Sequence, residues 1–232
     1  MANTGCSKDK PVADIGAGTG KLTKILLDKG LTVKAVEPND NMRGYGILNT
    51  HGKSVKWSEG VGEDTGLNES SVYAAFFGSS FNVVDPQKAL AEVARILVPG
   101  GWFACMWNHR DTEDETQKAI ENIIFSHLPD YSYGARRQDP TPIIEASGLF
   151  GEVYSIEKRF NVLMTAAQIV EAWRSHDTLF RQSGEKFERI ISDIANLLSS
   201  SEYSVPYFTR IWYSRLAIDK SDLASELYKL TL

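Results

Sequence analysis

The residues best suited to chemistry form a glycine-rich segment near the start of the chain, Asp14-Ile15-Gly16-Ala17-Gly18-Thr19-Gly20. Glycines let the backbone approach a ligand closely and adopt torsion angles that other residues avoid. A helix predicted to begin at Lys21 would offer the unpaired N–H groups of its first turn to a carboxylate or a phosphate. We therefore expect a ligand-binding turn, and the alternative is a tight turn that binds nothing.

The spacing of the glycines and a nearby acid indicate the class of ligand. The pattern is G-x-G-x-G followed by Lys21, whereas a dinucleotide-binding turn requires G-x-G-x-x-G. Glu37 ends the second predicted strand, where it can accept hydrogen bonds from both hydroxyls of a ribose. Asp14 suits a ligand that carries an amino group better than a pyrophosphate. We expect a cofactor that contains a nucleoside, and a nicotinamide-dependent dehydrogenase is the less favoured alternative.

The elements that would position these residues alternate between strand and helix in the front half of the chain. Such alternation is typical of a parallel sheet with crossover helices. The predicted strands cover residues 11–15, 32–36, 55–58, 72–77 and 102–107. The predicted helices cover residues 21–29, 42–50 and 87–97.

The back half of the chain has a different pattern. Thr112 and Glu115 form a possible capping box for a helix that runs to Phe125. Two more strands are predicted at 152–162 and 207–217, with helical patterns at 166–180 and 184–198 between them. We read the helices as an insertion, residues 165–200, over the ligand edge of the sheet. No linker is visible, so we expect one domain over 1–232, with a cofactor-binding half (11–110) and a substrate-side half (111–218).

Composition excludes several classes of protein. The 232 residues include 25 basic and 30 acidic side chains, a net charge of −5 that argues against a general nucleic-acid binder. No apolar run is long enough to cross a membrane, and the first ten residues lack the apolar core of a signal peptide. Cys6 and Cys105 do not make a disulfide framework, and no metal-ligand spacing is present. We expect a cytoplasmic protein without membrane or nucleic-acid partners, and the oligomeric state stays open.

Taken together, these segments resemble the class I S-adenosylmethionine-dependent methyltransferases, close to the type 11 group that acts on small molecules. The resemblance is carried by VADIGAGTGKLT, AVEPNDNM, ALAEVARILVPGG and the strand leading to WNHRD, within residues 11–110. WRSHD and YFTRIW are similar, more distantly, to trans-aconitate methyltransferase-like proteins. The resemblance implies an α/β fold: a Rossmann-like, seven-stranded, mostly parallel sheet with helices on both faces. Its last strand would be antiparallel, after a helical insertion.

The resemblance also implies a function and a set of cofactor contacts. The function is methyl transfer from S-adenosyl-L-methionine to a small-molecule acceptor, at an oxygen, a nitrogen or a carboxylate. Most of the implied contacts surround the methionine part, the ribose or the adenine of the cofactor, and Gly78 would approach it by its backbone. The implied cofactor-binding residues are Asp14, Gly16, Ala17, Gly18, Gly20, Glu37, Met42, Gly62, Glu63 and Gly78.

Four features depart from the family pattern, and one of them is Tyr73, which replaces a common Asp in the fourth predicted strand. Val61 stands where family members often have an Asp that accepts a hydrogen bond from the adenine. Asn82-Val83 stands where many have His-Trp. Only ten residues precede the first predicted strand, where relatives usually carry a helical segment. These departures favour an alternative, a cofactor-binding protein of the same fold whose turnover is weak or lost.

Candidates for catalysis and acceptor binding come from the end of the fifth predicted strand and from the back half. Methyl transfer is an in-line displacement that depends largely on orientation, so a base is needed only if the acceptor must lose a proton. His109, after Trp107-Asn108, is the candidate base, and the alternative is a loop histidine that faces solvent.

Arg174 and Arg210 are candidates for binding an acceptor carboxylate, and the alternative is that each forms a structural ion pair. His176 is a candidate pocket residue. Ser175-His176-Asp177 is not expected to form a triad, because consecutive helical residues point roughly 100° apart.

Overall fold

The computed structural model of the protein describes residues 11–217, except for the side chains of residues 135 and 136. Cys6 lies outside the described residues. A seven-stranded sheet has the order β3-β2-β1-β4-β5-β7-β6. The strands are β1 (Val12–Ile15), β2 (Val33–Val36), β3 (Val55–Ser58), β4 (Val72–Gly78), β5 (Leu97–Arg110), β6 (Phe150–Thr165) and β7 (Glu202–Leu216).

Most neighbouring strands run parallel, as the resemblance implied. The pairs β1–β2, β1–β4, β2–β3 and β4–β5 are all parallel. The last strand, β7, is antiparallel to β5: the N–H of Asp111 donates to the carbonyl oxygen of Pro206, and the Thr209 hydroxyl donates to Asn108. As one position advances along β5, its partner recedes along β7, which is the antiparallel pattern. The predicted Rossmann-like, mostly parallel sheet is confirmed.

The chain divides into two compact units. Within the described residues, unit 1 comprises 11–107, 139–156 and 211–217, and unit 2 comprises 108–138 and 157–210. The strands β5, β6 and β7 contribute residues to both. The predicted organisation as one domain with halves at 11–110 and 111–218 stays a prediction.

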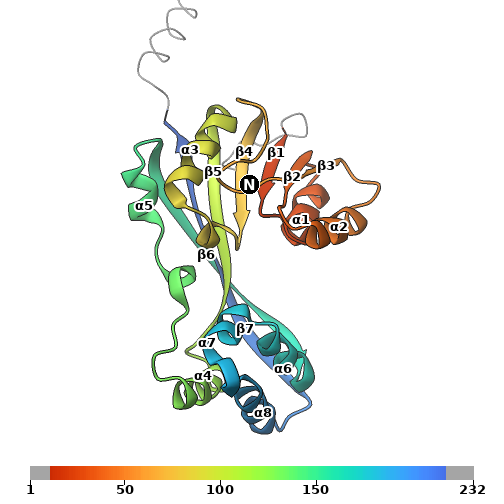
Figure 1. The fold of residues 1–232 in the computed structure, drawn as a ribbon, viewed down its shortest axis with the longest axis vertical. Coiled ribbons are helices and arrows are strands. Elements are labelled where there is room, and N and C mark those ends of the chain that lie inside the picture. Colours follow the sequence, from red (N-terminus) through yellow and green to blue (C-terminus); the bar gives the residue numbers. More distant parts are fainter. Residues whose placement is uncertain (1–10, 218–232) are drawn as a thin grey trace, which may run out of the picture. The chain divides into compact units, whose positions relative to one another are not determined.

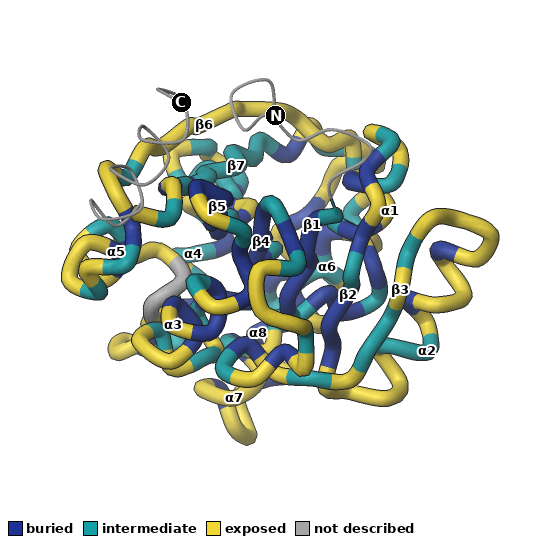
Figure 2. The backbone as a smooth tube through the Cα atoms, turned by 90° about the horizontal axis from the view of Figure 1, so that it is seen from above, coloured by how far each residue is buried: buried dark blue, intermediate teal, exposed yellow. Residues whose placement is uncertain are grey.

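In unit 1, helices cover both faces of the sheet. Its helices are α1 (Lys21–Asp28), α2 (Asp40–Asn49), α3 (Pro86–Ile96) and α5 (Thr141–Ala146), with a 3-10 turn η1 (Phe81–Val83). Side chains alternate across β4, so Phe76 packs in one apolar cluster with Leu26 of α1, and Phe77 packs in another with Leu90 of α3. Figure 2 shows buried positions gathered on β1 and β4. Because both faces are covered, these strands are almost continuously apolar.

Unit 2 is built around four helices, which Figure 1 shows as α4, α6, α7 and α8. Their bounds are Glu115–His127, Ala166–Arg174, Asp177–Ser183 and Phe187–Leu197, and two 3-10 turns, η2 (Gly134–Arg137) and η3 (Gly184–Lys186), connect them to neighbouring segments. They share one buried apolar cluster that includes Ile120, Trp173, Leu179 and Ile190. Since α6, α7 and α8 lie between β6 and β7 in the sequence, the predicted helical insertion is confirmed. None of the described helices is long and apolar enough to cross a membrane.

Several predicted boundaries are wrong. The strand predicted at 102–107 is β5, which begins at Leu97 and continues through Arg110. The pattern at 166–180 is two helices, because the first ends at Arg174 and His176 caps the second. The short helix α5 was not predicted, since its segment begins next to prolines and reads as a loop.

The predicted capping box at Thr112 is also wrong. Asp114 is the residue that caps α4, and its carboxylate accepts the N–H of Gln117 at 3.1 Å. An acid two residues closer to the helix accepts the kind of unpaired N–H donor that Thr112 was expected to satisfy. A capping box does occur elsewhere, at Thr165 and Gln168 of α6.

Candidate functional site

The glycine-rich turn joins the carboxyl end of β1 to the start of α1. Gly16, Gly18 and Gly20 all have positive φ angles, of 68°, 58° and 83°. Such angles strain any residue with a Cβ, so these glycines are required by the backbone itself. The N–H groups of Gly16 and Ala17 both donate to the carbonyl oxygen of Val36, at 2.9 and 3.0 Å, which ties the turn to the end of β2.

The end of β4 packs against this turn. A Cβ added at Gly16 would lie 2.5 Å from the Cβ of Ser80, and the Ser80 hydroxyl donates to the carbonyl oxygen of Ile15 at 2.6 Å. The order of the sheet reverses between β1 and β4. In open α/β sheets, ligands bind at the carboxyl ends of the strands beside such a reversal. The turn therefore lies where this architecture places its ligand.

Ser79 is a residue of this region that sequence reasoning missed. It follows β4 directly and has a φ angle of 64°, although it is not a glycine. A non-glycine residue held in this conformation costs of order 1 kcal/mol, and such strain gathers at functional sites. Its only signal in the sequence was its place, with Ser80, just after a predicted strand.

Glu37 connects the turn to the segment after β2. Its side chain is buried, with one carboxylate oxygen accepting the N–H of Gly18 at 2.8 Å and the other accepting the N–H of Asn39 at 2.9 Å. Each carboxylate oxygen can accept a second hydrogen bond. Glu37 therefore holds the turn in place and keeps acceptor capacity for a pair of hydroxyl groups.

Asp14 is buried beside the same turn, with 1% of its surface exposed. One carboxylate oxygen accepts the Thr23 hydroxyl at 2.6 Å, and the other has no hydrogen-bond partner within the described part of the chain. Burial raises the pKa of Asp14 to about 6, although the hydrogen bonds from Thr23 work in the opposite direction. A buried acceptor without a donor is the arrangement expected where a ligand N–H group binds.

The other implied cofactor residues occupy varied places. Met42, 43% exposed, has its methyl carbon 3.1 Å from where a Cβ on Gly18 would lie, so it sits at the turn. Glu63 accepts the N–H of Asp85 at 2.6 Å. Gly62 and Gly78 are required by packing, since an added Cβ would lie 2.6 Å from Val84 or 2.9 Å from Leu22, respectively.

Two of the departures from the family pattern, Val61 and Asn82, have clear environments. Val61 is 43% exposed, and its backbone pairs with that of Asp64. The side-chain oxygen of Asn82 accepts the indole N–H of Trp107 at 2.8 Å. Asn82 therefore serves packing within unit 1.

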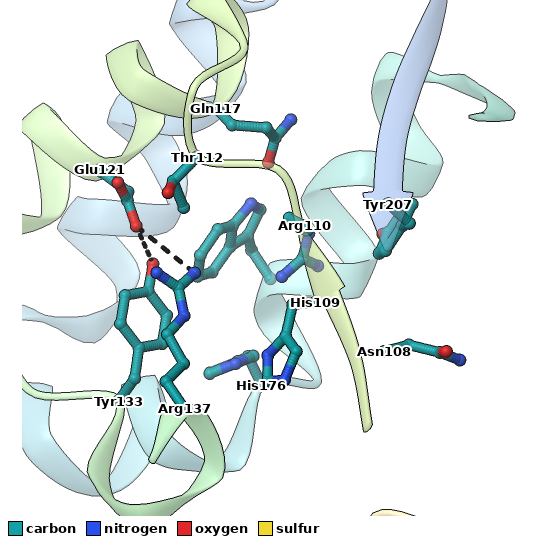
Figure 3. A pocket seen from close by; sticks show the side chains of 11 residues that line it. Asn108, His109, Arg110, Thr112, Gln117, Glu121, Tyr133, Arg137, His176 and Tyr207 are labelled. Carbon is teal, nitrogen blue, oxygen red and sulfur yellow. Dashed lines mark hydrogen bonds and ion pairs between the residues drawn. The ribbon is translucent and has the colours of Figure 1, made fainter. Parts of the chain in front are cut away.

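A second concave site lies wholly within unit 2, a cavity of about 210 Å³. Figure 3 shows polar and aromatic side chains grouped around it, from β5, α4, η2 and the segment that joins α6 to α7. Its lining includes His109, Arg110, Gln117, Tyr133, Trp173 and His176.

Both candidate histidines line this cavity. His109 is buried within β5, and its ring centre is 5.3 Å from that of Phe208, so the alternative of a solvent-facing loop histidine is wrong. His176 caps α7, and its Nδ1 accepts the N–H of Leu179 at 3.3 Å. His176 lies between α6 and α7, so the expected spacing of roughly 100° between consecutive helical residues does not describe Ser175-His176-Asp177.

The structure does not bring Arg174 and Arg210 to the cavity. Arg174 pairs with Glu188 and Arg210 with Glu157, each at 2.7 Å. These are the ion pairs that the alternative predicted for them. The arginines that do line the cavity are Arg110 and Arg137. Sequence reasoning missed Arg110, which lies next to His109.

Comparison with known proteins agrees with the geometry of unit 1. Residues 13–105 match the family model described as "Methyltransferase domain". A relative from Mycobacterium tuberculosis, "Uncharacterized methyltransferase Rv3342", is 41% identical over 113 residues. Residues 13–105 are thus similar in sequence to methyltransferase domains. The alignment with Rv3342 covers 49% of this chain and 46% of the relative, so the chain spans about half the length of the curated relatives it matches.

Solved structures extend the similarity of fold beyond this methyltransferase domain. The YcgJ protein from Bacillus subtilis superposes with a TM-score of 0.55 at 16% identity, covering 93% of this chain and 95% of that one. A geranyl diphosphate methyltransferase, solved in complex with S-adenosylmethionine, gives a TM-score of 0.51 at 15% identity, covering 90% and 78%. The chain therefore has the class I methyltransferase fold.

The methyltransferase domain fits the cofactor that its fold implies. S-adenosylmethionine carries an ammonium group and a ribose diol. The unpartnered oxygen of Asp14 suits an ammonium donor, and the remaining acceptor capacity of Glu37 suits the diol. Among residues 11–217, no group of three or more His, Cys, Asp or Glu side chains is arranged to hold a metal ion.

Proposed function

We propose that the protein is an S-adenosyl-L-methionine-dependent methyltransferase that acts on a small molecule. The observation that carries this proposal is the arrangement of Asp14, the glycine-rich turn and Glu37 at the reversal of the sheet order. The family match and the names of the relatives support it. The proposal does not specify whether the methyl group goes to an oxygen, a nitrogen or a carboxylate of the acceptor. It names no partner other than this small molecule.

In this proposal each group of residues has a role in holding the cofactor. Asp14 accepts from the ammonium group, and Glu37 accepts from the ribose hydroxyls. Met42 packs on the adenine, with Gly62 and Glu63 along its edge. The glycine-rich turn, including Ala17, surrounds the methionine part. Gly78, which has no side chain, allows the backbone at the end of β4 to approach the cofactor.

The cofactor supplies a methyl group on a sulfonium, a reactive electrophile, so the chain mainly has to orient the acceptor for in-line attack. We propose His109 as the base for an acceptor that must lose a proton, and His176 as a candidate acceptor contact. Arg174 and Arg210 could contact an acceptor only by leaving their ion pairs with Glu188 and Glu157. The variant His109→Asn should lower turnover by about a hundredfold to ten-thousandfold with S-adenosylhomocysteine affinity unchanged. Unchanged turnover would remove His109 from catalysis.

Calorimetric titration with S-adenosylhomocysteine, and with NAD as a control, tests the cofactor assignment. We expect saturable binding of the first ligand only. Glu37→Ala should weaken it by about 1.5–3 kcal/mol, because a charged acceptor of two hydroxyl donors is lost. Asp28→Ala, which removes a carboxylate at the far end of α1, should leave affinity unchanged.

Binding of neither ligand would contradict the proposal, and binding of NAD alone would favour a dehydrogenase. The alternative, a cofactor-binding protein with weak or lost turnover, draws on Asn82, whose side chain is occupied by Trp107. Tight binding of S-adenosylhomocysteine without methyl transfer to any acceptor in a broad screen would favour it.

A further inference from the structure

The cavity of unit 2 contains buried polar groups that lack partners. Gln117 and Trp173 both line it, and each is 2% exposed. Neither polar atom of the Gln117 amide nor the indole N–H of Trp173 has a hydrogen-bond partner within the described residues. Leaving such groups unsatisfied costs about 1–3 kcal/mol each, so native proteins rarely keep them without a ligand or bound water.

The charge around the cavity favours an anion. Arg110 has no carboxylate within ion-pair distance in the described part of the chain, and its guanidinium lies over the ring of Trp173, 4.2 Å from the ring centre. Arg137 has a partner, Glu121, at 3.7 Å. The one lining carboxylate is therefore matched by one guanidinium, and the charge of Arg110 remains uncompensated.

The carboxylate of Glu121 also accepts a hydrogen bond from Tyr133. The hydroxyl of Tyr133 donates to Glu121 at 2.5 Å, and burial together with this carboxylate raises the pKa of Tyr133. The phenol thus stays neutral and keeps Glu121 occupied. An incoming anion meets Arg110 rather than an unsatisfied carboxylate.

The volume and walls of the cavity limit the size of the ligand. A buried cavity of about 150 Å³ in another protein binds benzene, which has six heavy atoms. By proportion, a cavity of about 210 Å³ holds about eight or nine heavy atoms, and because it is partly open to solvent, a single-ring ligand of about ten heavy atoms also fits. The rings of Tyr133, Trp173 and Tyr207 line it, and they offer contact area for a flat apolar body.

We propose that unit 2 binds a small, flat carboxylate of single-ring size. Its carboxylate pairs with Arg110, and a polar substituent hydrogen-bonds to the Gln117 amide or the Trp173 indole. The site concerns unit 2 alone, so it stands whether or not the bound molecule is a methyl acceptor.

The test is calorimetric titration of the full chain, without any cofactor, with 4-hydroxybenzoate, benzoate and the neutral 4-hydroxybenzamide. We expect 4-hydroxybenzoate to bind at least tenfold more tightly than 4-hydroxybenzamide. Arg110→Gln should remove that preference, and the matched control Arg189→Gln, on the exposed surface of α8, should retain it. Gln117→Leu should weaken 4-hydroxybenzoate about fivefold and leave benzoate unchanged.

Equal affinity for the carboxylate and the amide, or no binding of either carboxylate at millimolar concentration, would overturn the proposal. The proposal would also be overturned if Arg110→Gln and Arg189→Gln had the same preference for 4-hydroxybenzoate over 4-hydroxybenzamide. If Arg110→Gln does not fold, the wild-type comparison and Gln117→Leu still decide. Because no cofactor is present, these outcomes are independent of the S-adenosylhomocysteine titration that tests the proposed function.

Discussion

Asp14 shows how a single residue can link a buried charge to ligand binding. Burial in the apolar sheet disfavours its ionised form and raises its pKa to about 6. Between about pH 4 and about pH 6, the carboxyl group of Asp14 therefore keeps its proton in the native chain without ligand, whereas it has lost that proton in the unfolded chain. This contribution to stability is present in acid and is lost as the pH rises through about 6. A ligand ammonium reverses the preference, because it pairs with the ionised carboxylate.

The affinity for S-adenosylhomocysteine should therefore depend on pH. We expect it to rise about tenfold between about pH 5 and about pH 7, as Asp14 loses its proton. Asp14→Asn should bind more weakly and with no rise over that range. Calorimetry at several pH values measures this, and a rise in the Asn variant equal to that of the wild type would assign the proton to another group.

Among single residues, the ones that could be predicted belong to local patterns. Asp14, Glu37 and the glycines follow from their spacing around one strand and one turn. Gln117 and Trp173 could not be predicted as pocket residues, because each sits at an ordinary apolar-face position of its helix. Only the packing of α4 with the insertion shows that their polar atoms lack partners.

At the scale of elements, α2 contains two glycines with opposite surroundings. Apart from the adjoining residues and backbone of α2 itself, no atom lies within 4 Å of where a Cβ on Gly44 would be, whereas a Cβ on Gly46 would overlap the ring of Trp57. Gly46 thus allows α2 to pack closely on β3. Gly44 only weakens the helix, because glycine has a lower helix propensity than alanine.

The two alanine variants should therefore differ in sign. Gly44→Ala should raise the free energy of unfolding by about 0.5–1 kcal/mol through helix propensity. Gly46→Ala should lower it by about 1–3 kcal/mol through overpacking against Trp57. Urea denaturation measures both, and equal shifts in the two variants would rule out the Trp57 contact as the cause.

The existence and order of elements in the front half could be predicted, because each strand and helix carries its own periodicity. The length of β5 could not be. Pro99-Gly100-Gly101 is a helix-ending signal, yet β5 begins at Leu97, which pairs with Val72 of β4, and the pairing resumes at Trp102 after an irregularity. The pairing of distant segments overrides local preference there.

At the scale of the whole molecule, each unit has its own apolar core and its own candidate site. Ligands for the two sites should then protect different stretches of backbone. At a hundred times its dissociation constant, a ligand stabilises its binding state by about 2.7 kcal/mol, which slows linked amide exchange up to about a hundredfold.

Hydrogen exchange with mass spectrometry can separate these effects. S-adenosylhomocysteine should slow exchange in residues 13–24 and 36–43 of unit 1, and 4-hydroxybenzoate should slow it in residues 108–121 and 131–138 of unit 2. Each ligand serves as the control for the other. Protection of unit 2 segments alone by S-adenosylhomocysteine would contradict the site assignment.

The interleaving of the two units also sets an order of events during synthesis on the ribosome. Unit 1 is made of three stretches of chain, and the last of its described stretches, 211–217, follows the final residue of unit 2. Unit 2 can therefore be completed while unit 1 still lacks the end of β7. Unit 1 is thus the last to receive all of its described residues, although its first described stretch precedes all of unit 2, and neither unit can be isolated by a single truncation.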